Sequence, residues 1–247
     1  MRLTVVGCAG SYARPDSTAS CYLVEHDGFR VVLDMGNGSL GALARHTDLV
    51  DGIDAVLLSH CHIDHCADLG SLYIVRKWGP RAASRLPVQG PSVALERLMQ
   101  IDGTRTPEPL LEQFSIGSWS EEPFELGPFT VTSAPMAHPV ETFAIRLDAG
   151  GRSLTYSGDT GPTPLLEGLA RGTDLALFEA SVVGPNTIPD LHLSGAEAAQ
   201  AATAAGAERL LLTHLVGWND DADVLAEGRE HFAGHVDLAF SGMIVDV

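Results

Sequence analysis

The sequence has few basic residues, and this scarcity narrows the range of partners. Lys and Arg together number 15 against 32 Asp and Glu, which gives a formal charge of −17, and Lys77 is the single lysine. Such an acidic surface repels polyanions, so long nucleic acid and anionic membranes are poor partners unless a local basic patch exists. The charge therefore favours small ligands.

Export and membrane features are also missing. The first residues lead directly into a strand-like segment without signal-peptide architecture, and no apolar run has the length of a membrane span. The four cysteines form no C-x-x-C pair, so we expect reduced thiols rather than a disulfide framework. We expect a cytoplasmic protein with no membrane partner, folded as a single domain over residues 1–247.

One short motif is dense in potential metal ligands. The run H-x-H-x-D-H places His60, His62, Asp64 and His65 directly after the apolar stretch 55–59. Neutral imidazole nitrogen and carboxylate oxygen suit zinc and its first-row neighbours, and such residues make a poor apolar core. A buried strand that ends in ligands would place the site at its C-terminal edge. The pattern predicts a metal centre, and Cys61 and Cys66 beside it are expected to pack rather than to bind metal.

Strand and helix patterns alternate along the whole chain without a clear linker. We expect strands at 3–6, 21–25, 29–34, 55–59, 87–90, 124–126, 129–133, 143–147, 153–157, 175–179, 209–213, 236–240 and 244–247. We expect helices at 36–46, 64–77, 92–101 with Ser92 as N-cap, 164–171, 194–206 with a Ser194–Glu197 capping box, and 222–232. The segment 102–123 is rich in Pro, Gly, Ser and Glu, which predicts a surface loop or a mobile lid.

These motifs resemble those of the metallo-β-lactamase superfamily, whose ligands occur in the same order. The resemblance implies an α/β fold, the four-layer αββα sandwich, with two metal ions at one edge between the sheets. It implies that His60, His62 and His138 bind one ion, that Asp64, His65 and His214 bind the other, and that Asp159 bridges them. The same ligands accept two zinc ions, or manganese or iron.

The chemistry of two such ions can be argued directly. Divalent ions about 3.5–4 Å apart lower the pKa of a bridging water, and the resulting hydroxide attacks an electrophilic centre. The acidic residues Asp64 and Asp159 supply anionic balance, while His adds no charge. The sequence therefore predicts a metal-dependent hydrolase.

Two further residues point towards phosphodiesters. Glu179 ends an expected strand and His192 precedes an expected helix, and they resemble the pair with which the ribonuclease Z group protonates its leaving oxygen. A proton donor suits phosphodiesters because an alkoxide is a poor leaving group. The predicted catalytic residues are therefore Asp64, Glu179 and His192.

The spacing argues against a tRNA substrate. Only 21 positions separate His138 from Asp159, where tRNA-processing relatives carry a basic arm. The motifs at 7–11, 157–161, 190–195 and 211–214 resemble those of arm-less actinobacterial phosphodiesterase-like proteins proposed to act on cyclic nucleotides. We expect a small phosphodiester substrate such as a cyclic nucleotide, with a tRNA 3′-processing endoribonuclease or a thioester or lactone hydrolase as alternatives, and a homodimer as the possible assembly.

Substrate contacts outside the ligand motifs are less defined by sequence. The basic segment Arg76, Lys77, Arg81 and Arg85 either contacts phosphate or is a solvated helix end, and the second is favoured. The aromatic candidates for stacking on a base are Tyr12, Trp78, Trp119 and Trp218, with core or rim packing as the default for each.

Overall fold

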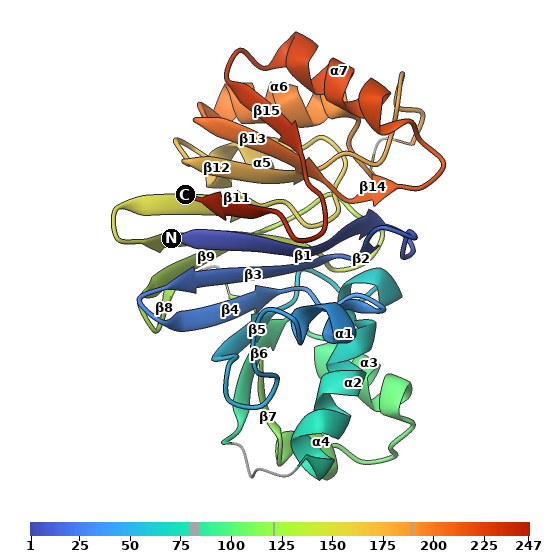
Figure 1. Ribbon diagram of the computed structural model, residues 1–247, viewed down its shortest axis with the longest axis vertical. Helices are drawn as coiled ribbons and strands as arrows, with labels where there is room; N and C mark the ends of the chain where they lie inside the picture. Colours follow the sequence, from blue (N-terminus) through green and yellow to red (C-terminus); the bar gives the residue numbers. More distant parts are fainter. Residues whose placement is uncertain (80–83, 121, 189) are drawn as a thin grey trace.

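The structure is a computed structural model that describes residues 1–79, 84–120, 122–188 and 190–247. Its strands form two sheets (Figure 1). The first sheet has the order β14-β1-β3-β4-β5-β6-β7, with β2 and β16 also paired to β1. Its strands are β1 (Arg2–Gly10), β2 (Thr18–Ala19), β3 (Cys21–His26), β4 (Phe29–Leu33), β5 (Ala55–Leu57), β6 (Leu86–Gly90), β7 (Phe114–Ser118), β14 (Leu215–Val216) and β16 (Ile244–Asp246).

The second sheet has the order β15-β13-β12-β11-β10-β9-β8. Its strands are β8 (Phe124–Leu126), β9 (Phe129–Pro135), β10 (Phe143–Ala149), β11 (Arg152–Tyr156), β12 (Leu175–Glu179), β13 (Arg209–Thr213) and β15 (His235–Leu238). The strands β11, β12, β13 and β15 are parallel, so their carboxyl ends lie at one edge. That edge carries several of the polar residues discussed below.

Helices cover the outer face of each sheet. Those on the first sheet are α1 (Ser39–Leu43), α2 (Ile63–Trp78), α3 (Ala94–Asp102) and α4 (Glu108–Leu111). Those on the second are α5 (Pro164–Leu169), α6 (Gly195–Ala205) and α7 (Asp221–His231). The two groups lie towards opposite ends of the long axis of the molecule (Figure 1). Among the described residues, no helix is both long and apolar enough to cross a membrane.

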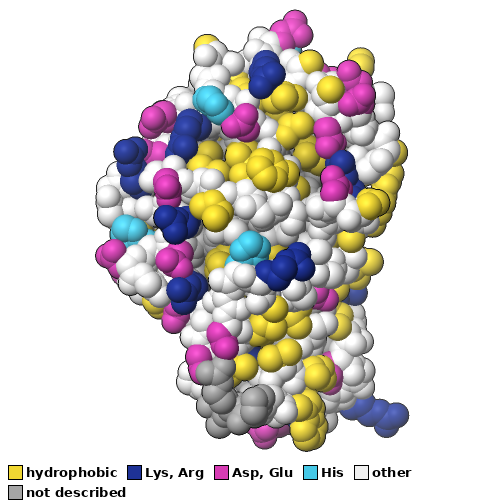
Figure 2. Space-filling model, in the orientation of Figure 1, with side chains coloured by type: hydrophobic (Ala, Val, Ile, Leu, Met, Phe, Trp, Pro, Cys, Tyr) yellow, Lys and Arg dark blue, Asp and Glu magenta, His cyan; other side chains and the backbone are white. Residues whose placement is uncertain are grey.

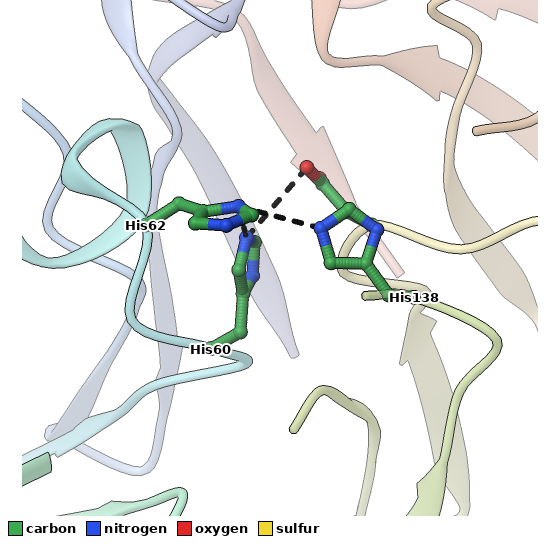
Figure 3. Close-up of side chains that lie close together, drawn as sticks. His60, His62 and His138 are labelled. Carbon is green, nitrogen blue, oxygen red and sulfur yellow. Dashed lines mark hydrogen bonds and ion pairs between the residues drawn. The ribbon is translucent and has the colours of Figure 1, made fainter. Parts of the chain in front are cut away.

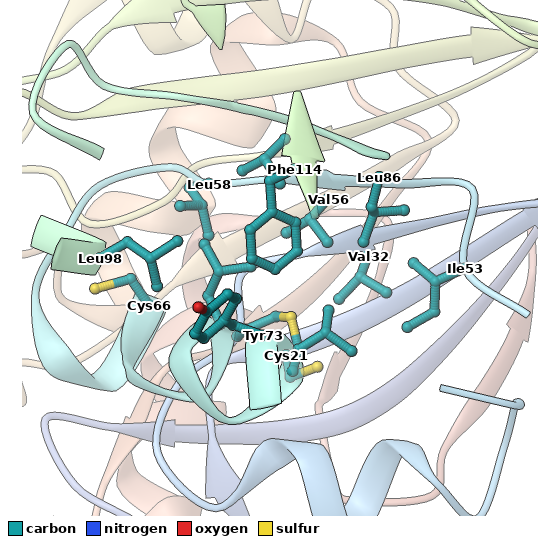
Figure 4. Close-up of a cluster of buried hydrophobic side chains, with 14 of the residues drawn as sticks. Cys21, Val32, Ile53, Val56, Leu58, Cys66, Tyr73, Leu86, Leu98 and Phe114 are labelled. Atoms are coloured by element: carbon teal, nitrogen blue, oxygen red, sulfur yellow. The ribbon is translucent and has the colours of Figure 1, made fainter. Parts of the chain in front are cut away.

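Three apolar clusters hold these layers together. The first joins the first sheet to its helices, through residues such as Val56, Leu98 and Phe114 (Figure 4). The second lies between the sheets, and the third joins the second sheet to α5, α6 and α7. Burying a Val, Leu or Phe side chain contributes about 1.5–3 kcal/mol, so the clusters supply most of the driving force for this arrangement. Three interfaces between four layers confirm the predicted αββα sandwich.

Several predicted elements agree closely with the structure. The strands β12 and β13 have the predicted bounds. The chain turns between β3 and β4 at Asp27 and Gly28, and both residues have the positive φ that a tight hairpin requires. The capping box of α6 is present in both directions between Ser194 and Glu197. Local pattern and tertiary structure agree in these segments.

Other predictions were wrong. The helix expected over 36–46 is limited to α1, and Ser92 does not cap α3 because its N–H and hydroxyl both donate to the Glu141 carboxylate. The segment 102–123 is not simply a loop or lid, since it contains α4 and the strand β7. The strand β7 pairs in parallel with β6, and the fully buried Phe114 ties it to the first apolar cluster.

Candidate metal centre

The seven predicted ligands lie where strands of both sheets end. Four lie between the end of β5 and the first turn of α2, one follows β9, one follows β11, and one separates β13 from β14. In that order they are His60, His62, Asp64, His65, His138, Asp159 and His214. The first sheet thus supplies the dense motif, and the second sheet supplies the three single ligands.

The structure brings these residues together in two clusters. One contains His60, His62, His138 and Asp159, and the other contains Asp64, His65, Asp159 and His214. In each cluster one nitrogen or carboxylate oxygen per residue lies within 4.8 Å of the others. Asp159 belongs to both clusters, which is the arrangement that the family resemblance implied.

The first cluster points ring nitrogens at one another. His62 Nδ1 lies 3.1 Å from His60 Nε2 and 3.3 Å from His138 Nε2 (Figure 3). The outer nitrogens of the two flanking rings are already engaged, because His60 Nδ1 lies 3.1 Å from the Ser59 hydroxyl and His138 Nδ1 donates to the Leu191 carbonyl. In a neutral ring the Nε2 atom, which faces into the cluster, therefore carries no hydrogen, and its lone pair is available to bind a cation.

Two histidines of the second cluster are hydrogen-bonded in the same way. His65 Nδ1 donates to Asp34 at 2.7 Å, and His214 Nδ1 donates to the Ser181 hydroxyl at 2.6 Å. Their Nε2 atoms then face each other at 3.2 Å. Two lone pairs cannot satisfy each other, and a metal ion shared between them can.

The shared carboxylate of Asp159 supports the same conclusion. Its Oδ1 is buried and lies 3.2 Å from His65 Nε2 and 3.5 Å from His214 Nε2, but it accepts no hydrogen bond. A buried carboxylate oxygen without a partner is costly, and coordination to a cation would remove that cost. The donor set of both clusters fits a dinuclear metal site.

The protonation of the rings reflects this environment. Burial lowers the pKa of His60 well below its usual value, which favours the neutral form that binds metal. Burial also disfavours a charged His65, but the carboxylates of Asp159 and Asp34 raise its pKa well above the ordinary value. The clusters therefore attract positive charge at the position where a metal ion would bind.

A buried carboxylate behind the ligands was not predicted from the sequence. Asp34 is fully buried and accepts hydrogen bonds from Ser59 N–H and Oγ, His65 Nδ1 and Tyr156 Oη, each at 2.7 Å. It therefore fixes the ring of one ligand and the backbone beside another. The feature of the sequence that could have pointed to Asp34 is its position at the end of an apolar, strand-forming run.

Backbone strain is concentrated around the clusters. Among the described residues, four non-glycine residues have positive φ, and three of them, Ser11, Asp34 and His214, contact the second cluster or belong to it. Each such conformation costs about 1–3 kcal/mol unless the surrounding contacts compensate for it. Here the Ser11 N–H donates to Asp64 Oδ2 at 2.8 Å, so the strained backbone holds a ligand in place.

The predicted acid pair lies beside both clusters. His192 Nδ1 lies 2.8 Å from Glu179 Oε1, and Glu179 is fully buried. Burial disfavours the charged form of His192, but the neighbouring carboxylate of Glu179 raises its pKa to about 9. The Ser181 hydroxyl, which the sequence did not single out, donates to Glu179 Oε2 at 2.8 Å and links the pair to His214.

An open cleft gives access to the ligand atoms. It has a volume of about 320 Å³, and its lining includes His62, Asp159 and His192. Arg97, on α3, also lines it and places a guanidinium at its rim, although the sequence did not suggest this residue. Such a cleft has the size of a small-ligand site.

The described residues of the predicted basic segment do not line this cleft. Arg76 is buried and donates to the carbonyls of Val50 and Ser84, which gives it a structural role in the last turn of α2. Lys77 lies near the Tyr73 and Trp78 rings, Arg85 is exposed, and Arg81 falls outside the described residues.

The four aromatic candidates have different surroundings. Trp119 is partly buried and donates its indole N–H to the Leu58 carbonyl, so it packs with the core. Trp78 ends α2 and is exposed. Tyr12 and Trp218 contact each other, and Trp218 lines a second cavity together with His192.

Several known proteins are similar to this chain over most of its length. A model described as the beta-lactamase superfamily domain matches residues 30–215. The uncharacterized protein Rv1339 of Mycobacterium tuberculosis (strain H37Rv) is 43% identical over 243 residues, which cover 96% of this chain and 88% of that protein. The probable metallo-hydrolase YhfI of Bacillus subtilis is 28% identical, and its crystal structure matches with a TM-score of 0.88 over 99% of both chains. Ribonuclease Z of Mycobacterium bovis (strain BCG / Pasteur 1173P2) is 27% identical over 96% of this chain and 95% of that protein.

Proposed function

The chain belongs to the metallo-β-lactamase superfamily, and from that membership we propose that it is a dinuclear metal-dependent hydrolase that cleaves a small phosphodiester such as a cyclic nucleotide. The observation that carries the proposal is the pair of Glu179 and His192, hydrogen-bonded at 2.8 Å beside both ligand clusters. A proton donor at this place is needed to expel a poor leaving group such as an alkoxide, whereas an activated leaving group departs without one.

The ligand clusters define where the ions would bind. His60, His62 and His138 would hold one ion, Asp64, His65 and His214 the other, and Asp159 both. Two bound divalent ions supply an activated water and neutralise charge on phosphoryl oxygens. Zinc suits the nitrogen and oxygen donors, and manganese or iron accept the same set.

The protein's own groups then have separate tasks. The Glu179 carboxylate raises the pKa of His192 and so favours its protonated form, and the bond to Glu179 through Nδ1 leaves the Nε2 proton for the departing oxygen. Glu179 holds the ring in place and stabilises its charged form. Arg97 would pair with the single negative charge of a phosphodiester at the rim of the cleft.

Charge and size favour a small substrate over tRNA. The formal charge is −17, and on the face shown in Figure 2 the Lys and Arg side chains are interspersed with Asp and Glu. A long polyanion needs a continuous basic surface, whereas a cyclic nucleotide carries one negative charge. The cleft of about 320 Å³ suits a ligand of that size.

A hydrolysis panel would test the proposal. We expect the metal-replete protein to hydrolyse bis-p-nitrophenyl phosphate and cyclic nucleotides, and His62→Ala or Asp159→Ala to abolish this. His46→Ala is the matched control, because His46 is exposed and outside both clusters. Much faster cleavage of nitrocefin, S-lactoylglutathione or a lactone would instead indicate another hydrolase of the superfamily.

The second candidate is a tRNA 3′-processing endoribonuclease. It is favoured by the similarity to the Mycobacterium bovis protein named ribonuclease Z, which extends over nearly the whole chain. A precursor tRNA transcript in the same panel separates the two functions. Efficient 3′ cleavage of the transcript together with inert cyclic nucleotides would support the endoribonuclease.

A further inference from the structure

A second cavity adjoins the metal cleft. It has a volume of about 410 Å³, and it shares Ser11, Leu191 and His192 with the cleft. The two spaces are therefore neighbours, with His192 on the wall of both. A group that leaves the cleft past His192 would enter this second cavity.

The second cavity is mainly apolar and presents an uncovered indole. Trp218 is 70% exposed although it lines the cavity, and its ring centroid lies 5.7 Å from that of Tyr12 at an interplanar angle of 33°. The aliphatic side chains of Val182, Val183 and Val216 add to the walls. A large aromatic surface left open to water favours contact with another flat apolar surface.

The polar groups of the second cavity carry little charge. The described residues that line it include no Asp, Glu, Lys or Arg, and His192 is its one titratable residue. Asn219 is held in place because its amide nitrogen donates to the Ser181 carbonyl at 2.8 Å. Such a lining suits a neutral ring with a few polar edge atoms better than a second phosphate or a charged chain.

We propose that this cavity is a binding subsite for a flat aromatic or heteroaromatic ring carried by the leaving group of the substrate, with Trp218 as the stacking surface. The inference rests on the proposed phosphodiesterase function, because His192 would protonate the oxygen that connects the ring-bearing group to phosphorus. It adds a substrate requirement that the metal clusters alone do not impose. A nucleobase has the required chemistry, since every base has a face that stacks on an aromatic side chain.

A matched pair of substrates tests the requirement. One is adenosine 3′,5′-cyclic phosphate, and the other is the cyclic phosphate of methyl β-ribofuranoside, which has the same reacting atoms without the base. We expect kcat/KM to be about 5- to 150-fold higher for the base-bearing substrate, and Trp218→Leu to remove most of that ratio. Trp78→Leu is the control, because Trp78 is 73% exposed and lies at the end of α2.

A binding measurement separates this subsite from catalysis. Adenosine, which has no phosphate and cannot be hydrolysed, is titrated into the protein as purified while tryptophan emission is followed. We expect the quenching seen in the natural and Trp78→Leu proteins to be lost in Trp218→Leu. Quenching without hydrolysis of either cyclic phosphate would refute the phosphodiesterase and leave the ring subsite standing. Hydrolysis with equal kcat/KM for both substrates, or quenching that survives Trp218→Leu, would overturn the subsite.

Discussion

Replacing the buried carboxylate behind the ligands tests the proposed metal centre most directly. Asp34→Asn keeps the size of the side chain but removes its charge and turns one acceptor oxygen into an NH₂ group. In the structure, Oδ2 accepts from Ser59 Oγ, His65 Nδ1 and Tyr156 Oη, while Oδ1 accepts from the Ser59 N–H. Either orientation of the amide places NH₂ against at least one donor.

The expected cost follows from these contacts. Loss of a hydrogen-bonding partner behind a ligating histidine typically weakens metal affinity by about 10–100-fold, which corresponds to about 1.4–2.7 kcal/mol. A buried donor left without an acceptor costs about 1–3 kcal/mol in addition, so the free energy of unfolding should fall by a similar amount. The second cluster should lose affinity more than the first, because His65 belongs to the second.

The assay is a competition titration with a chromophoric zinc chelator, combined with the metal content of the purified protein. Asp68→Asn is the matched control, since this partly buried carboxylate accepts from Leu40 N–H and Ser71 Oγ. We expect two zinc ions per chain in the control and weakened binding of one in Asp34→Asn. Unchanged zinc affinity in Asp34→Asn, with the fold intact by circular dichroism, would refute this role of Asp34.

Three further predictions concern the acid, the backbone and the ions. His192→Ala should retain both metals but lower kcat by about 10²–10⁴-fold on alkyl phosphodiesters, and much less on p-nitrophenyl esters; equal losses would argue against a proton donor. Gly36→Ala should lower the free energy of unfolding, measured by chemical denaturation, by about 1–3 kcal/mol, because the new Cβ would lie 2.0 Å from the Asp64 carbonyl oxygen. Gly41→Ala is the control and should be tolerated, because its Cβ would meet nothing within 4 Å. Chelation should lower the melting temperature by roughly 8–16 °C if the free metal was about 1,000-fold above its dissociation constant, and an unchanged melting temperature would argue against resident ions.

Apolar runs with clear ends could be located from the sequence. The segment that became β12 is buried throughout and that of β13 is buried after Arg209, and the bounds of both strands agree with the prediction. The strand β7 was missed because Ser, Gly, Pro and Glu around it resemble a loop. Its register comes from parallel pairing with β6, a contact that its own composition does not encode.

Some residues of the site could likewise be recognised from the sequence, and others could not. The dense motif from His60 to His65 could be recognised from the sequence because three histidines and one aspartate stand within six residues. Asp34, Ser181 and Arg97 could not be found in this manner, since each is far in sequence from the metal ligand that it approaches. Ser181, for example, connects Glu179 to His214 only after two strands of one sheet are adjacent.

The division of ligands between the two sheets has a consequence for how the protein is made. Four ligands are available once residue 65 has been synthesised, but His214 is added about 150 residues later. At about 5–20 residues per second, an emerging chain exposes an incomplete ligand set for roughly 7–30 s. The first cluster lacks donors until Asp159 has been added and the second until His214 has been added, so an ion captured early would be held weakly and could exchange. A complete second cluster would therefore exist only after both sheets have come together.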